Sequence, residues 1–370
     1  GEATQLTTGT DYSLQQRNAV RQVDSRPLDH IWPDVHYQNW GLFAETKTQL
    51  SSRHTLRLGL RLDAVTSDAE SADELALGAT VREQYVAFNG PDAQEVGRRN
   101  LLPSADAVFQ YEPTGPWSAY GGLNATSRAP DIGQRYRALL GALGGGLEIG
   151  NPTLDPEVQW GLATGLRWRT KQLWATLDVF AHRVQDYISR QPVDQLGANT
   201  VFGYRNKDAE FWGTEIGAIW RPTDRVEFPF SFGVTRARDV NTRTGLGEIP
   251  PWESTGGIHI QSTLFDRTCR TDLDFRYVAG QRNPHPAVAP LWADTADFLL
   301  VHLRAEIDLH ESFTLSVAVE NLFDQDHYEY LTPPVGGPVP AGRPRSGDLH
   351  AGERIPGRGR SFYATAEWRF

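Results

Sequence analysis

The sequence contains little or none of several features that define whole classes of protein. Its 370 residues include one cysteine, Cys269, and no methionine. A single cysteine excludes an intrachain disulfide framework and any cysteine-rich zinc site. No stretch approaches the ~20 consecutive apolar residues that a membrane-spanning helix needs. No charged segment followed by an apolar one opens the sequence, so it shows no signal peptide. Either a signal peptide has been removed or the sequence is an internal-to-C-terminal piece of a longer protein, and we expect the second.

The charge balance narrows the possible functions further. Lysine and arginine number 36 against 46 aspartate and glutamate residues, which gives a formal net charge of −10. An acidic chain argues against nucleic-acid binding, because that function usually requires a basic face. Aromatic residues make up 11% of the chain, which is too many for a disordered protein.

What the sequence does contain is a strict alternation of apolar and polar residues, typical of β-strands with one apolar face. Within 298–309, Leu303 and Ile307 share the apolar parity, whereas His302 and Arg304 lie on the polar one. Similar alternation runs through 54–63, 172–182, 313–320 and 362–370. The apolar residues of these segments, including Leu315, Val317 and Trp368, are expected to face lipid.

A soluble β-sandwich would show the same alternation, but three details favour a transmembrane barrel. The strands run to about ten residues or more, the length that a tilted strand needs to cross a bilayer. Their apolar faces begin or end in aromatics, as interfacial girdles do; these are Trp40, Trp117, Trp160, Trp168, Trp220, Trp368 and Phe370. Short turns also alternate with long polar loops.

The short turns are predicted near 51–54, 113–116, 170–171, 222–225, 266–268 and 310–312. The long loops are predicted at 13–33, 66–100, 127–155, 188–200, 239–251, 282–296 and 325–358. About fourteen strands then lie near 4–12, 34–49, 54–65, 102–112, 117–126, 157–169, 172–187, 201–221, 226–238, 253–265, 270–281, 297–309, 313–323 and 360–370. The predicted fold class is therefore an all-β, antiparallel transmembrane barrel.

Six segments resemble, in order, the motifs of one known family. They are Ser-Arg-Ala-Pro-Asp at 127–131, Asn-Pro-Thr-Leu-Asp-Pro-Glu at 151–157, the segment 178–188, the segment 204–215, Asn-Leu-Phe-Asp at 321–324, and Pro-Gly-Arg at 356–358 leading to the terminal Trp-Arg-Phe. Together they resemble the C-terminal part of the β-barrel of a TonB-dependent outer-membrane receptor. Each motif is weak alone, but six in family order are specific.

The resemblance implies a barrel of 22 strands that is filled by an N-terminal plug, neither of which is complete in this sequence. It implies energy-coupled uptake of a scarce nutrient, such as a ferric siderophore, another metal chelate or a cobalamin-like ligand, in the Gram-negative outer membrane. The TonB complex would act through the plug, which is absent here. It also implies that the barrel-assembly machinery recognises the last strand, with Phe362, Trp368 and Phe370 as the signal. The alternative for Phe370 is a simple girdle aromatic.

Two groups of residues are candidates for ligand binding. Arg128, Arg135, Tyr136 and Arg137 form a basic and aromatic cluster that suits an anionic chelate. Contact with lipopolysaccharide phosphates, or plain loop salt bridges, would explain the same residues equally well. His302 and Arg304 lie on the inward parity of their strand and are further substrate-binding candidates.

His30 and His36 are the candidates for a metal site, because histidine is the only metal-ligand type present in quantity besides carboxylates. Loop histidines of an acidic protein are more often simply solvated, and the lack of methionine counts against a copper-type receptor. No catalytic constellation, phosphate-binding loop or cofactor motif stands out, so we expect neither an enzyme nor a cofactor.

Two other functions remain open. The chain could be a complete fourteen-stranded passive channel for small or hydrophobic solutes, in which case the strand near Leu6 should pair with the strand near Trp368. It could also be a soluble β-rich binding protein, which would partition into buffer without detergent.

Overall fold

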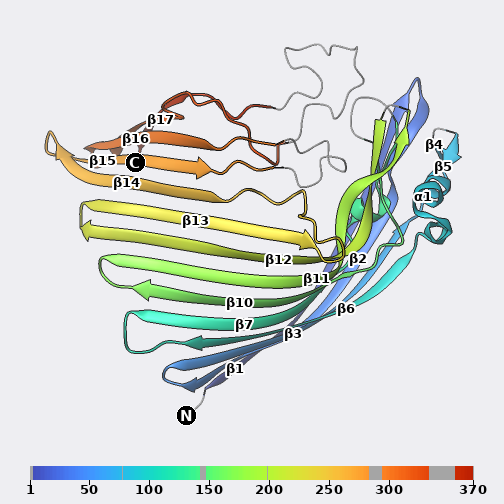
Figure 1. The fold of residues 1–370 in the computed structure, drawn as a ribbon, viewed down its shortest axis with the longest axis horizontal. Helices are drawn as coiled ribbons and strands as arrows, with labels where there is room; N and C mark the ends of the chain where they lie inside the picture. Colours follow the sequence, from blue (N-terminus) through green and yellow to red (C-terminus); the bar gives the residue numbers. More distant parts are fainter. Residues whose placement is uncertain are drawn as a thin grey trace.

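One long antiparallel sheet dominates the computed structural model, which describes residues 3–76, 78–141, 147–197, 199–282, 294–332 and 355–369. Figure 1 shows how this sheet curves. Fourteen strands follow one another in chain order across the sheet. They are β1 (Thr4–Val23), β2 (Arg26–Ser51), β3 (His54–Ala69), β6 (Arg98–Tyr111), β7 (Trp117–Arg128), β10 (Glu157–Arg169), β11 (Leu173–Leu196), β12 (Asn199–Thr223), β13 (Val226–Asp239), β14 (Glu253–Leu264), β15 (Arg267–Val278), β16 (Phe298–His310), β17 (Phe313–Glu320) and β18 (Ser361–Trp368).

This architecture confirms the predicted class and the predicted number of strands. Short turns join β2 to β3, β6 to β7, β10 to β11, β12 to β13, β14 to β15 and β16 to β17, at or beside the predicted positions. In the described part of the chain β1 pairs only with β2 and β18 only with β17, so the pairing that a closed fourteen-stranded channel requires is not found there.

Two segments predicted as long loops are in fact the ends of extended hairpins. Residues 13–33 continue β1 and begin β2, and residues 188–200 continue β11 and begin β12. The first hairpin closes over Asp24 and Ser25, whose φ angles are 49° and 64°. Two consecutive left-handed residues make a tight turn that matches strand twist, so the polar composition of this segment was misleading. Gly197, with a φ of 62°, allows the second tight turn.

The predicted loops 66–100 and 127–155 fold together into a compact unit, here called the loop cluster. It contains β4 (Leu75–Ala76), β5 (Ala79–Thr80), α1 (Val81–Asn89), the 3₁₀ helix η1 (Pro91–Gln94), α2 (Ile132–Tyr136), β8 (Ala138–Leu139) and β9 (Leu147–Ile149). Thr80 with Glu83 and Asp131 with Gln134 form capping boxes that start the two α-helices. Val81, Tyr85, Tyr136 and Ile149 form its fully buried core with Val35 of β2. No described helix is long and apolar enough to cross a membrane.

The two faces of the sheet differ in crowding and in polarity. Large apolar side chains of one parity are widely exposed, among them Leu60 at 65%, Leu123 at 64% and Trp368 at 64%. On the opposite parity, a Cβ atom added at Gly161 would lie 2.2 Å from Oδ1 of Asn124. Side chains converge on the concave side of a curved sheet and diverge on the convex side. The apolar residues therefore form the outer face and the polar residues form the inner face of the curved sheet in Figure 1.

Tryptophans mark two levels on the outer face. Trp160 and Trp168 of β10, and Trp212 and Trp220 of β12, lie eight residues apart in each strand and are all more than 40% exposed. Eight residues span ~26 Å along a strand, or ~20 Å across a bilayer at the usual tilt, close to the apolar band of an outer-membrane barrel. The upper girdle, at Trp160 and Trp212, lies on the side of the long loops, and the lower girdle lies beside the short turns.

Candidate functional site

The inner face carries a row of charged residues contributed by four neighbouring strands. Glu227 of β13 is the register partner of His259 of β14, which pairs with Asp272 of β15, which in turn pairs with Arg304 of β16. Because register partners point to the same side of a sheet, the strand register places these four side chains next to one another.

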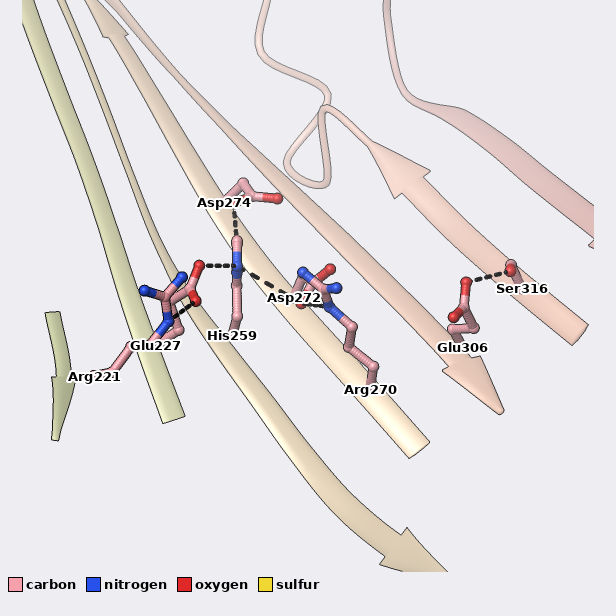
Figure 2. Close-up of polar contacts among 8 residues, drawn as sticks. All are labelled: Arg221, Glu227, His259, Arg270, Asp272, Asp274, Glu306 and Ser316. Atoms are coloured by element: carbon pink, nitrogen blue, oxygen red, sulfur yellow. Dashed lines mark hydrogen bonds and ion pairs between the residues drawn. The ribbon is translucent and has the colours of Figure 1, made fainter. Parts of the chain in front are cut away.

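His259 lies among Glu227, Asp272 and Asp274, as Figure 2 shows. Its Nε2 atom lies 2.8 Å from Oδ1 of Asp274, and its Nδ1 atom lies 3.9 Å from carboxylate oxygens of both Glu227 and Asp272. The backbone makes room for this arrangement, because a Cβ at Gly257 would lie only 2.6 Å from Asp274 and 3.0 Å from the imidazole.

Two arginines contact carboxylates of this row, and a serine contacts the nearby Glu306. Arg221 Nε donates to Glu227 at 2.7 Å, Arg270 Nε donates to Asp272 at 3.0 Å, and Ser316 Oγ donates to Glu306 at 3.0 Å. Asp274 is 47% exposed and Arg270 is 57% exposed, so these groups remain in contact with solvent. Ion pairs this exposed add little stability. They give the inner face a polar, charged surface.

His302 and Arg304, predicted as inward-facing, do belong to this inner face. His302 is the register partner of Asp274, and its Nδ1 atom accepts a hydrogen bond from the backbone N–H of Asn321 at 3.3 Å. Arg304 faces Asp272 across the register. Sequence alternation identified the face, whereas His259 could be found only through the strand register.

The predicted cluster of Arg128, Arg135, Tyr136 and Arg137 is divided by the structure. Arg135 and Tyr136 are 1% and 0% exposed inside the loop cluster. Arg135 donates to Ser67 Oγ at 2.9 Å and to Asn100 Oδ1 at 2.8 Å, and Tyr136 donates to the carbonyl of Val96 at 2.8 Å. Burial lowers the pKa of the Arg135 guanidinium and raises the pKa of Tyr136. In this structure both side chains hold the loops together.

Arg128 and Arg137 remain accessible but lie in different surroundings. Arg128 donates to Glu157 at 2.8 Å, and Arg137 lies 3.5 Å from Glu148. The Arg137 guanidinium lies 6.0 Å from the ring centre of Trp32, and Arg17 of β1 lies 5.3 Å from the same ring.

A second arginine and aromatic pair lies beside this one, and it was missed because 188–200 was taken as a loop. Arg190 stacks over Phe202 at 4.3 Å and contacts Glu148 at 3.2 Å. Tyr204 Oη also donates to Glu148, at 2.8 Å. Glu148 therefore joins Arg137, Arg190 and Tyr204. Arg17, Arg137 and Arg190 with Trp32 and Phe202 form what we call the arginine–aromatic group, above the upper girdle.

The two histidines proposed as metal ligands are held apart. His30 Nδ1 lies 3.3 Å from Glu74, and His36 Nδ1 lies 3.1 Å from Glu70. Each therefore makes its own contact between β2 and the loop cluster. Within the described residues no group of three or more histidine, cysteine or carboxylate side chains is arranged to hold a metal ion.

The C-terminal strand places Phe362 and Trp368 on its outer face, 73% and 64% exposed, and Phe370 lies outside the described residues. The Asn-Leu-Phe-Asp element at 321–324 serves as a structural anchor. Asn321 Nδ2 donates to the carbonyls of Gln325 and Arg358 at 3.0 and 3.2 Å, and Asp324 accepts from the Arg360 N–H at 2.8 Å. These bonds tie together the two ends of the long segment between β17 and β18.

Comparisons with known proteins agree with this architecture. Residues 1–322 match the family model described as TonB dependent receptor-like, beta-barrel. The iron-regulated outer membrane virulence protein of Vibrio cholerae serotype O1 is 24% identical over 240 residues, which covers 61% of this chain and 36% of that protein.

Two solved structures are similar across almost the whole chain. The copper transporter OprC has a TM-score of 0.79 at 23% identity, covering 99% of this chain and 56% of its own. The ferric-catecholate import receptor Fiu of Escherichia coli K12 has a TM-score of 0.69 at 15% identity, covering 100% and 52%. At such identities the likeness establishes the fold alone. The chain spans about a third to a little over half of the length of these proteins.

Proposed function

Because this chain belongs to the TonB-dependent receptor β-barrel family and lies in the Gram-negative outer membrane, we propose that it is the C-terminal barrel portion of a nutrient-uptake receptor. Members of this family are receptors and transporters, not enzymes. The observation that carries the proposal is the contrast between an apolar outer face and a charged, partly solvated inner face on the same fourteen strands.

In this proposal the ligand is captured at the long-loop side and passes along the inner face. The row from Glu227 to Arg304 would keep that path wet and would offer both signs of charge to a polar ligand. Energy would come from the TonB complex through a plug outside this chain, and the strand ending in Trp368 would be recognised by the barrel-assembly machinery.

The chemistry above the upper girdle favours an anionic metal chelate as the ligand. Arg137 and Arg190 share one carboxylate, Glu148, and Arg17 lies over Trp32 beside them. Three arginines and one carboxylate give the arginine–aromatic group a net positive charge. Guanidinium groups stacked on Trp32 and Phe202 could bind both carboxylate or catecholate oxygens and flat ring surfaces. Arg128 is placed to add a further positive charge at the loops.

The test is uptake by cells that produce the full-length receptor carrying this chain. A deletion strain should lose growth on one class of ferric chelate, and the natural receptor should restore it. Uptake of radioactive iron supplied in that chelate should stop when a protonophore removes the proton gradient. Uptake that continues without the gradient, or without TonB, would instead support a passive channel. Rescue by cobalamin or ionic copper alone would contradict the chelate.

The arginine–aromatic group can be tested in the same cells. The triple variant Arg17→Gln, Arg137→Gln and Arg190→Gln should raise the chelate concentration for half-maximal uptake about tenfold while leaving the maximal rate unchanged. Lys171→Gln in a short turn is the matched control. An unchanged concentration dependence would place the ligand elsewhere.

A further inference from the structure

Two adjacent grooves lie on the outer face, away from the path proposed for the nutrient. The first, of about 860 Å³, is lined on each of six strands by two outward-facing residues and by the backbone between them. The second, of about 910 Å³, shares Leu60, Ala105, Ala125 and Trp160 with the first.

The grooves result from the order of large and small residues across the register. In one row Leu58, Ala107, Leu123, Leu162 and Ala181 are successive partners. In the next, Leu60, Ala105, Ala125 and Trp160 follow one another. Alanines between leucines and tryptophans leave hollows in this part of the outer face.

A charged rim closes the long-loop end of the first groove. Trp160, Arg183, Glu210 and Arg238 are successive register partners on β10, β11, β12 and β13, so all four point outward at the upper girdle. Arg238 donates to Glu210 at 2.7 Å and lies 5.5 Å from the ring centre of Trp212.

The rim itself carries one more arginine than carboxylates, and Asp186 lies beside it, because the Asp186 N–H donates to Asp208 at 3.3 Å. Arg183 contacts Asp208 at a looser 3.4 Å, and Arg236 makes no hydrogen bond or ion pair with any described residue. Three arginines thus face two carboxylates at the depth where lipid headgroups lie. At the mouth of the second groove, by contrast, lie Asp155 and Asp186, which would repel an anion.

We propose that this face of β3 to β13 is a binding site for a phosphorylated lipid of the outer leaflet that carries several acyl chains. The phosphate binds at Arg183, Arg236 and Arg238, and acyl chains fill the two grooves on either side of Trp160. Two adjoining grooves under one cationic rim suit a single headgroup with more than one chain. The acidic mouth of the second groove places the phosphate over the first.

The test uses the purified full-length receptor in detergent, with lipid binding measured by native mass spectrometry and by the shift in thermal unfolding. Bisphosphorylated, multiply acylated lipid A should bind and stabilise the receptor. The same lipid after enzymatic removal of its phosphates should bind at least tenfold more weakly. Inorganic pyrophosphate should neither stabilise the receptor nor displace the lipid.

Variants separate the two halves of the site. The triple variant Arg183→Gln, Arg236→Gln and Arg238→Gln should weaken binding of the phosphorylated lipid about tenfold and leave the dephosphorylated lipid unaffected. Ala125→Phe, which fills the hollow shared by both grooves, should weaken both lipids. Arg267→Gln at a short turn and Ala175→Phe beside the lower girdle are the matched controls and should weaken neither.

Each contrary result would overturn the proposal. Equal binding of both lipids by the natural receptor would show that the rim does not bind the phosphate. Undiminished binding by Ala125→Phe would show that the acyl chains do not occupy the grooves. Competition by pyrophosphate would identify a site for free phosphate instead. Heat-modifiable migration reports whether each variant has folded. If the triple variant does not fold, Arg236→Gln alone provides the charge test, because Arg236 has no ion pair with any described residue.

Discussion

The two faces of the same strands have opposite polarity: the outer face is apolar and the inner face is charged. On β16, Leu303 points outward among the apolar partners Leu273 and Val319, whereas His302, the next residue, points inward opposite Asp274. The outer face gains stability by excluding water, while the inner face pairs charged groups and leaves some of them, such as Asp274 and Arg270, in contact with solvent. The loop cluster follows a third pattern, because some of its polar groups, such as Arg135 and Gln84, are as deeply buried as its apolar core. A charged side chain buried in the loop cluster therefore holds the structure together, whereas one exposed on the inner face stays accessible to solvent.

The largest expected effect tests the two faces directly. Leu303→Arg should lower the free energy of unfolding by about 2–4 kcal/mol, because it places a charge near the middle of the lipid-facing band. His302→Arg should be tolerated far better, since its side chain meets water and Asp274. Folding of the full receptor into lipid vesicles, followed through denaturant titration, measures both. Equal costs at the two positions would contradict the assignment of faces.

The loop cluster should give the next largest effect, but a local one. Arg135→Gln would leave Ser67, Asn100 and the Leu154 carbonyl without their donors, which should destabilise the loop cluster by about 2–3 kcal/mol. Hydrogen exchange should rise in α1 and α2 while the strands stay protected. Arg137→Gln is the matched control and should change exchange little. Increased exchange throughout the sheet would show that the loop cluster is not an independent unit.

The inner row should be far more tolerant. Asp274→Asn keeps the size of the side chain and removes one half-exposed charge beside His259, so it should cost at most about 1 kcal/mol. The denaturation midpoint of the full receptor measures this cost, with Asp266→Asn in a short turn as the control. A cost of several kcal/mol would mean that the inner face is a dry core and not a wetted path.

The smallest equilibrium effect is expected at the chain's last residue. Deleting Phe370 should slow membrane insertion while leaving the denaturation midpoint of the folded barrel almost unchanged, because strand recognition acts during assembly. Assembly rate and denaturation midpoint are compared in the full receptor. Phe362→Ala, which removes a second aromatic side chain of the same strand, is measured alongside. A shifted midpoint with an unchanged rate would favour the girdle role alone.

Strand number, strand face and most short turns were determined by the sequence, because alternation with a period of two is a property of neighbouring residues. His302 and Arg304 were placed on the inner face for the same reason. The two hairpin tips were missed because polar composition resembles that of a loop, while the actual signal is a pair of residues able to adopt positive φ, as Asp24 and Ser25 do.

Only the tertiary structure decided which charged residues meet. His259 sits among three carboxylates, Arg135 is buried, and His30 and His36 are separated, because each outcome depends on register and loop packing between segments far apart in sequence. The same holds for the hollows beside Trp160, which form where alanines of some strands lie in register between leucines and tryptophans of their neighbours. A local period fixes the direction of each side chain, but hydrogen-bonded register, which is non-local, fixes its neighbours.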